Sequence, residues 1–186
     1  MSLQHQHNFL ARLYTDAEFR RAFLSAPEKI GAENDLNNQE IAEIAEIMPE
    51  ELNFFADSLF WKRRRAVEKF LPLTKKLLQN DFEVLFREFS QNFNPQTVEK
   101  HFEDALEFSK FLQNQKVSQI AQNVAKFEHS KLEFFGNGKR FAYCKLDFDV
   151  REIHRKDTQT LKLSLKKRRT IAVWLRTGKK IKYFLI

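Results

Sequence analysis

Apolar residues recur every three or four positions through the first three quarters of the chain. In the stretch from residue 49 to 71, the repeat is formed by Leu52, Phe55, Leu59, Ala66 and Phe70. A period near 3.6 places these residues on one face of an α-helix. The same spacing predicts further helices at about 16–25, 27–30, 38–47, 72–93, 95–112 and 117–135.

Local sequence signals mark where these helices begin and end. Side chains that accept a backbone N–H favour a helix start, proline fits the first turn, and glycine favours a helix end. The signals are a Thr15–Glu18 capping box, a cap at Asn37 or Asn38, an Asn94-Pro95 start and an end at Gly136–Gly138.

After Gly138 the period changes from 3.6 to 2. Apolar residues at 142, 144, 146, 148 and 150 alternate with polar or aromatic ones, which is typical of a half-buried strand. Three shorter runs at 160–166, 170–176 and 180–186 follow. The chain is therefore expected to be α+β: a helical body over residues 1–135 and a small antiparallel meander at the C-terminal end.

The parity of the apolar positions predicts how the last three strands pair. Leucine, isoleucine and valine stand at odd positions in all three runs, and opposite residues of an antiparallel pair share a face. Loops of three residues, at 167–169 and 177–179, keep the odd positions together. This register places Leu165 opposite Ile171 and Leu175 opposite Ile181, with the odd side chains directed to the interior.

The even positions then form one water-facing side that is rich in cations and aromatic rings. Sheets that bind single-stranded nucleic acids stack bases on aromatic side chains and hold phosphates with cations. An ordinary solvated face, with the tryptophan packed under a loop or helix, is the alternative. The predicted nucleic-acid-binding residues are Lys162, Lys166, Trp174, Arg176, Lys180, Lys182 and Phe184.

Charge separates the two parts of the chain. Residues 1–138 carry 17 Lys/Arg against 21 Asp/Glu, and residues 139–186 carry 15 against 4. We expect a phenylalanine-rich helical body at 1–138, with a division into 1–71 and 72–138 as an alternative, followed by a basic strand region at 139–186. A balance of +11 in the strand region favours an anionic partner, although this region could also dock on the acidic body.

The sequence lacks the motifs of common catalytic and metal sites. No glycine-rich phosphate loop, zinc-protease motif or nucleophile elbow occurs, and Cys144 is the single cysteine, on the inward side of its strand. His129 and Glu133 are four residues apart, but no further ligands accompany them. We expect no catalytic residue, cofactor or metal, no membrane span, and a cytoplasmic location because a single cysteine suits a reducing compartment.

One stretch resembles a known family. The segment "LPLTKKLLQNDFEVLFREFSQNF", the Asn94-Pro95 turn and the run Ala125–Glu128 are similar to helical domains labelled as DNA-binding, within residues 70–135. Members of that family accompany metal-dependent enzymes as partner proteins in ribosomal-peptide maturation. The segment "YTDAEFRRAFLSAPEKIGAENDL" is similar to small helical modules found beside peptide leaders and enzyme subunits, and to a bacterial family that joins such a module to a basic tail. The resemblance implies a non-catalytic helical protein that binds a peptide, a protein or DNA.

Three functional hypotheses follow. The third is an enzyme whose catalytic residues lie far apart in the sequence and meet only in the folded protein. The first is a non-enzymatic protein that binds nucleic acid, or another polyanion, through the basic and aromatic face of the C-terminal strands. The second is an adaptor or partner subunit of a bacterial biosynthetic system that presents a groove or sheet edge to a protein or peptide.

Overall fold

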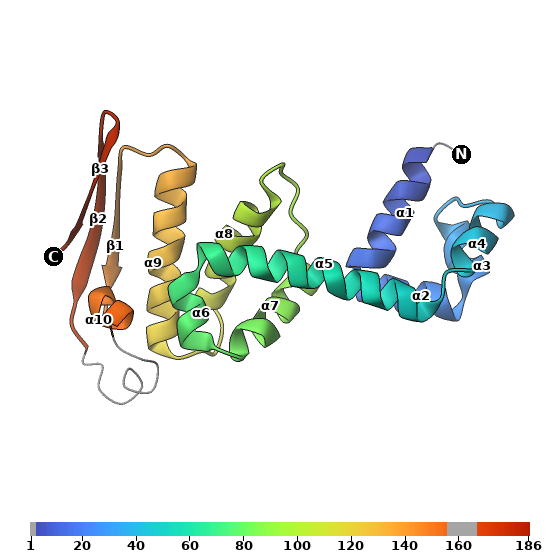
Figure 1. The fold of residues 1–186 in the computed structure, drawn as a ribbon, viewed down its shortest axis with the longest axis horizontal. Coiled ribbons are helices and arrows are strands. Elements are labelled where there is room, and N and C mark those ends of the chain that lie inside the picture. Colours follow the sequence, from blue (N-terminus) through green and yellow to red (C-terminus); the bar gives the residue numbers. More distant parts are fainter. Residues whose placement is uncertain (1–2, 156–166) are drawn as a thin grey trace. The chain divides into compact units, whose positions relative to one another are not determined.

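The structure is a computed structural model, which describes residues 3–155 and 167–186. The predicted α+β class is confirmed: helices form most of the chain, and a three-stranded antiparallel sheet of order β1-β2-β3 lies at the C-terminal end (Figure 1). The helices are α1 (Leu3–Thr15), α2 (Ala17–Ser25), α3 (Pro27–Glu33), α4 (Asn38–Ala45), α5 (Pro49–Phe70), α6 (Pro72–Leu78), α7 (Asp81–Asn92), α8 (Lys100–Gln113), α9 (Gln119–Gly136) and α10 (Val150–Arg155). The strands are β1 (Phe141–Leu146), β2 (Thr170–Thr177) and β3 (Lys180–Leu185).

The chain folds as two compact units. One comprises residues 1–63 and 90–94, and the other comprises residues 64–89 and 95–186. The strands belong to the second unit because their inner side chains share a core with α6 and α9. The described strands of residues 139–186 therefore share the core of the second unit.

The first unit is built around a buried cluster from α1, α2 and α4. The ring of Phe9 packs edge-on against Phe19 and Phe23, with centroids 5.1 and 5.3 Å apart. Asp16 caps α2 by accepting hydrogen bonds from the N–H groups of residues 18 and 19. The predicted cap at Thr15 is wrong because that hydroxyl donates to the carbonyl of the preceding turn and Thr15 ends α1 instead.

In the second unit, α9 lies between α8 and the sheet. A run of phenylalanines in contact with one another joins α7 to α8, with Phe108 touching Phe82, Phe86 and Phe89 at centroid distances of 5.1–5.3 Å. The opposite side of α9 faces the sheet. This one helix therefore connects the aromatic cluster to the strands, which explains why a period near 3.6 is visible along its sequence.

Helix α6 begins without a capping side chain of its own. Its N-terminal N–H groups at Leu73 and Thr74 donate instead to the two carboxylate oxygens of Glu128 on α9, each at 2.9 Å. Glu128 is buried, and burial raises the pKa of its carboxyl group. A carboxyl group far along the chain thus replaces a local cap and joins the two helices.

Helix α8 begins later than predicted. The Asn94-Pro95 pair lies in a connecting segment, and the N–H groups of Gln96 and Thr97 both donate to one oxygen of Glu103. These bonds, at 3.0 and 2.8 Å, hold a turn in front of the helix, which starts only at Lys100. The start predicted at Pro95 is therefore wrong.

The end of the first strand also differs from the prediction. β1 stops at Leu146, because the N–H of Asp147 donates to the side chain of Asn123 on α9 rather than continuing a ladder. Asp149 then caps α10 by accepting from the N–H of Arg151, at 2.9 Å. The alternation that predicted a strand as far as Val150 instead places Val150 at the buried start of a short helix.

The hairpin between β2 and β3 has a two-residue turn. Arg176 pairs with Ile181, and Leu175 pairs with Lys182, so only Gly178 and its successor lie in the turn. Gly178 has a φ of +60°, which suits the hairpin turn that requires glycine at its first central position. The predicted pairing of Leu175 with Ile181 is therefore wrong. The predicted strand at 160–166 lies outside the described residues. The predicted pair of Leu165 with Ile171 is wrong, because Ile171 pairs with Lys145 of β1 on one side and with Ile186 on the other.

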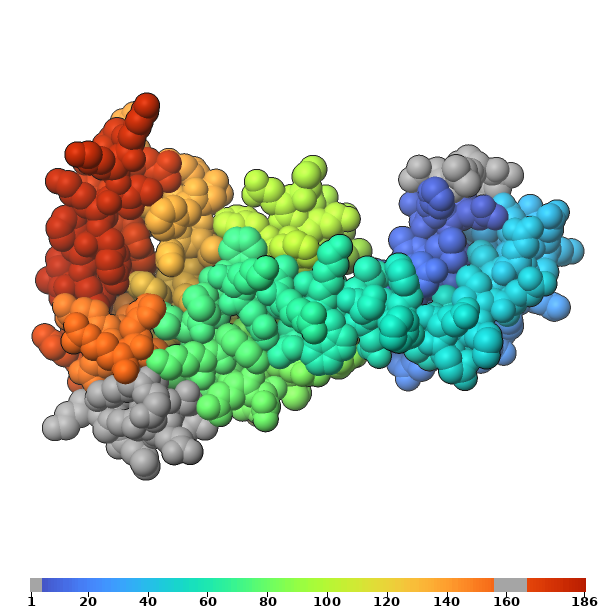
Figure 2. All heavy atoms as spheres, in the orientation of Figure 1, coloured from blue at the N-terminus to red at the C-terminus, as the bar shows by residue number. Residues whose placement is uncertain are grey.

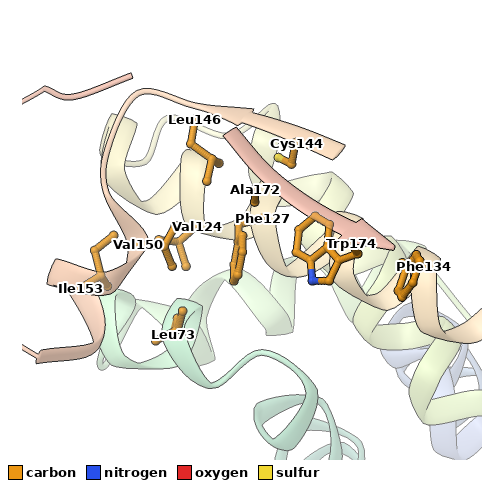
Figure 3. Close-up of a cluster of buried hydrophobic side chains, with 10 residues drawn as sticks. All are labelled: Leu73, Val124, Phe127, Phe134, Cys144, Leu146, Val150, Ile153, Ala172 and Trp174. Atoms are coloured by element: carbon orange, nitrogen blue, oxygen red, sulfur yellow. The ribbon is translucent and has the colours of Figure 1, made fainter. Parts of the chain in front are cut away.

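This register determines which side of the sheet is buried. Trp174 of β2 points at α9, where its ring lies 5.4 Å from Phe127 and 6.5 Å from Phe134 (Figure 3). The ring of Tyr183 on β3 lies 5.6 Å from Trp174 on the same side. Cys144 of β1 joins them in the core, as predicted, and burial raises the pKa of its thiol. The even positions of β1 and β2 thus share the inner face with the odd positions of β3.

Replacing Glu128 with Gln tests the connection between α9 and α6. A carboxyl whose pKa is higher in the folded than in the unfolded protein stabilises the fold while it is protonated, and that contribution is lost as pH rises through the folded pKa. Urea unfolding of the natural chain should show this loss above the unfolded value of about 4.3, whereas Glu128→Gln should lack it. Parallel pH profiles for the two proteins would contradict the assignment.

Two aromatic substitutions test the inner face. Trp174→Ala should lower the free energy of unfolding by about 3–5 kcal/mol because it leaves a cavity against α9. Phe184→Ala, on the other face of the sheet, should change it by less than about 1 kcal/mol. Equal losses in chemical denaturation would show that the two rings are not on opposite faces.

Candidate binding surface on the C-terminal sheet

The side of the sheet that faces away from α9 is an exposed and mainly apolar surface. We call it the outer face. It is formed by the odd positions of β1 and β2 and the even positions of β3, together with the residue that follows β3. Its side chains are Phe141, Tyr143, Lys145, Ile171, Val173, Leu175, Lys180, Lys182, Phe184 and Ile186.

The cross-strand rows place the apolar groups in the middle of this face. The central row is Tyr143, Val173 and Phe184, which lie directly opposite one another on the three strands. Leucine and isoleucine of β2 occupy the centres of the neighbouring rows, so the whole middle strand is aliphatic on this side. The lysines lie towards the two ends of the sheet, and no charge stands in the central row.

The aromatic residues of the outer face are open to solvent. Phe141, Tyr143 and Phe184 are 55%, 57% and 48% exposed. Five of the fourteen large apolar side chains exposed in the described part of the chain lie on this outer face: Phe141, Tyr143, Ile171, Phe184 and Ile186. Figure 2 shows β2 and β3, coloured red, at the molecular surface. An apolar concentration of this kind marks an interaction site more often than a solvated face.

The structure does not bring the predicted nucleic-acid-binding residues together on one side. Lys180, Lys182 and Phe184 lie on the outer face, but Trp174 is only 3% exposed and Arg176 is also on the inner side. The guanidinium of Arg176 lies 5.4 Å from the centroid of the Phe134 ring, a cation–π contact within the fold. Lys162 and Lys166 lie outside the described residues, so their positions stay predictions.

The expectation of a single cationic side was wrong because it assumed a three-residue loop. The two-residue turn shifts β3 by one position, which moves its even side chains to the side of the odd ones on β2. Tyr143 and Phe141 of β1 were missed because the pairing of β1 with β2 was not predicted. The Thr177-Gly178-Lys179-Lys180 sequence could have revealed the shift, since glycine at the first central position of a two-residue loop is a hairpin signature.

Several of the basic residues in this region already have internal partners. Arg151 forms a 2.7 Å ion pair with the buried Asp149, and Arg168 lies 3.8 Å from the same carboxylate. The hydrogen bond from Arg151 is the main reason why the pKa of Asp149 is lowered. Lys139 pairs with Glu133 at 3.5 Å. These pairs reduce the charge that is available to an external ligand.

The lysines of the outer face differ from these internally paired residues. Lys145, Lys180 and Lys182 are exposed, and none of them forms an ion pair with a residue in the described ranges. Their long aliphatic stems can lie along the apolar centre while their ammonium groups reach outward. The face therefore offers an apolar platform with positive charge towards its ends.

The polar side chains with possible chemical roles lie within the helical core. The Oγ of Ser109 lies 3.0 Å from Nδ1 of His129, whose Nε2 is 3.9 Å from Glu133. Ser109 is fully buried and its hydroxyl donates to the carbonyl of Leu106 at 2.7 Å, so its contact with His129 joins α8 to α9 within the core. Across residues 3–155 and 167–186, no three metal-binding side chains cluster, and no described helix is both long and apolar enough to cross a membrane.

Comparison with known proteins gives no guide to function. No protein-family model matches the sequence, and a search of curated proteins returns no match. What the outer face binds must therefore be argued from its own geometry and charge.

Proposed function

We propose that the protein is a non-enzymatic adaptor that binds a protein or peptide partner on the outer face of its C-terminal sheet. The observation that carries this proposal is the uncharged central row of Tyr143, Val173 and Phe184, flanked by further aliphatic residues of β2. Such side chains gain free energy when they leave water, by about 25 cal/mol for each Å² of apolar surface buried.

The charge on this face indicates the chemistry of the partner. Lys145 stands at one end of the outer face, and Lys180 and Lys182 stand towards the other. A partner with apolar side chains in its centre and carboxylates on its periphery complements this layout. Peripheral charges of this type guide the approach and fix the orientation more than they add affinity. The partner is thus an acidic polypeptide with an apolar centre, such as an extended segment of a bacterial biosynthetic system.

Binding of single-stranded nucleic acid is the second candidate function. Phe141, Tyr143 and Phe184 could stack bases, and the exposed lysines could neutralise phosphates. Two observations place this candidate second. Trp174, the largest ring of the predicted platform, is buried, and the middle strand presents aliphatic side chains that do not stack with bases.

A peptide selection with the full chain tests the proposal. Random peptides displayed on phage should yield sequences that combine apolar with acidic residues. A variant with Tyr143→Thr, Val173→Thr and Phe184→Thr keeps strand-forming residues but removes the apolar row. Its affinity for a selected synthetic peptide, measured by calorimetry, should fall by about 100-fold, since a few central residues dominate most interfaces.

The matched control is Phe54→Ala, which removes an exposed ring from α5 in the other unit and should leave affinity unchanged. Selected peptides that bind the triple-threonine variant as tightly as the natural chain would refute the proposal. Homopolymeric DNA or RNA that binds in place of peptides, with an affinity that falls steeply as salt rises, would support the second candidate instead.

A further inference from the structure

The outer strand of the sheet, β3, has a free edge. The N–H and C=O of Ile186 pair with those of Ile171 on β2, at 2.8 and 3.0 Å, which fixes the alternation along the strand. The even residues of β3 thus direct their backbone groups towards β2. The backbone groups of Ile181, Tyr183 and Leu185 point the other way, and no described residue pairs with them.

The other edge of the sheet is partly satisfied by α9. The carbonyl of Lys145 on β1 accepts a hydrogen bond from Lys126 at 3.0 Å, and the N–H of Asp147 is taken by Asn123. These contacts occupy backbone groups at the end of β1. β3 has no comparable cover from the described residues, so it is the more open edge for another strand.

β3 carries only one of the features that usually keep sheet edges apart, its outward-facing lysines Lys180 and Lys182. Its inward side chains are Ile181, Tyr183 and Leu185, with no inward-pointing charge, and the strand contains no proline. Ile181 is 42% exposed and Tyr183 is 47% exposed, although both lie on the apolar inner side. Helix α9 thus leaves part of the inner side of β3 exposed to solvent.

We infer that β3 pairs in antiparallel fashion with β3 of a second copy of the chain, about a two-fold axis at Tyr183. Residues with outward backbone groups must meet one another across such an edge, so odd positions pair with odd positions. Centring on Tyr183 uses the whole run from 180 to 186. Ile181 then pairs with Leu185 of the second copy, and Tyr183 pairs with itself.

The side chains are complementary in this register. On the outer face, Lys182 lies opposite Phe184 of the second copy, where an ammonium over a ring is favourable, and Lys180 lies opposite Ile186. A shift of two positions in one direction would place Lys182 opposite its own counterpart, which like charges disfavour. A shift in the other direction would shorten the overlap between the two β3 strands. The centred register is therefore the best of those that parity allows.

The pairing would join two three-stranded sheets into one continuous sheet with two-fold symmetry. The inner-side rings and aliphatic groups of the two β3 strands would cover each other, which removes the apolar exposure noted above. The two outer faces would become adjacent. This inference does not depend on what the outer face binds, because it uses only the backbone edge and the side chains of β3.

Cysteine crosslinking of the full chain tests the register. Tyr183→Cys should form a disulfide-linked dimer rapidly under mild oxidation, because a hydrogen-bonded antiparallel pair has Cα atoms about 5.5 Å apart, within disulfide range. Lys180→Cys is the matched control on the same strand. Its two copies would lie six positions out of line, at roughly 20 Å, and should not crosslink. Cys144 is buried in both proteins.

Sedimentation of the unoxidised chain across the micromolar range tests the dimer itself. The natural chain should show a concentration-dependent dimer, and Ile181→Lys, which places two buried ammonium groups in the pair, should weaken it by about 100-fold. Its far-ultraviolet circular dichroism should remain that of the natural chain. A chain that stays monomeric at every concentration, as expected if the edge instead receives a peptide strand, would overturn the inference. So would equal crosslinking of Lys180→Cys and Tyr183→Cys.

Discussion

The packing of Trp174 against α9 is the interaction on which the second unit depends. Its ring lies between Phe127 and Phe134 of the helix and Tyr183 of the next strand. An indole of this size cannot be buried on one side of a three-stranded sheet without assigning that side to the core. Every other inward side chain of β1 and β2 then follows from the alternation of a strand.

The turn after β2 determines which side chains of β3 lie on the inner face of the sheet and which lie on the outer face. Gly178 allows a two-residue connection, which pairs Arg176 with Ile181. Even positions of β2 therefore share a face with odd positions of β3. The aliphatic odd positions of β2 face water because Trp174 commits the even positions to α9. The two-residue turn then adds the even positions of β3 to the same outward side, and a loop one residue longer would have placed the odd positions of β3 there instead.

The helices were largely predictable because the information about them is local. The cap at Asn37, for example, accepts from the N–H groups of residues 39 and 40, and Glu40 reciprocates, as the residues around it suggest. The later start of α8 and the cap of α6 were not predictable, since Glu103 and Glu128 supply acceptors that only the folded chain brings into place. Helix α10 was missed for another reason, because its cap at Asp149 is local but the apolar alternation of β1 continues as far as Val150.

For the sheet, the sequence pattern predicts where the strands lie but not which of their faces is buried. Its presence at the C-terminal end follows from the period of 2, and both β2 and β3 lie where the alternation indicates. Which face is buried could not be derived from alternation alone, because Val173 and Trp174 are both adequate core residues and only one can point at α9. Tertiary packing made that choice, and the candidate site moved with it.

Net charge is a weak indicator of function in this region for a related reason. Residues 139–186 contain 15 basic and 4 acidic residues. Three of the basic residues, Arg151, Arg168 and Lys139, form ion pairs with Asp149 or Glu133 within the fold. The lysines that remain on the outer face are separated by an uncharged row. Positive charge acts over about 10 Å at 0.1 M salt and can attract many anions, but apolar burial acts only on contact. The choice among acidic partners therefore lies with the apolar row, and the lysines determine how quickly and in what orientation a partner arrives.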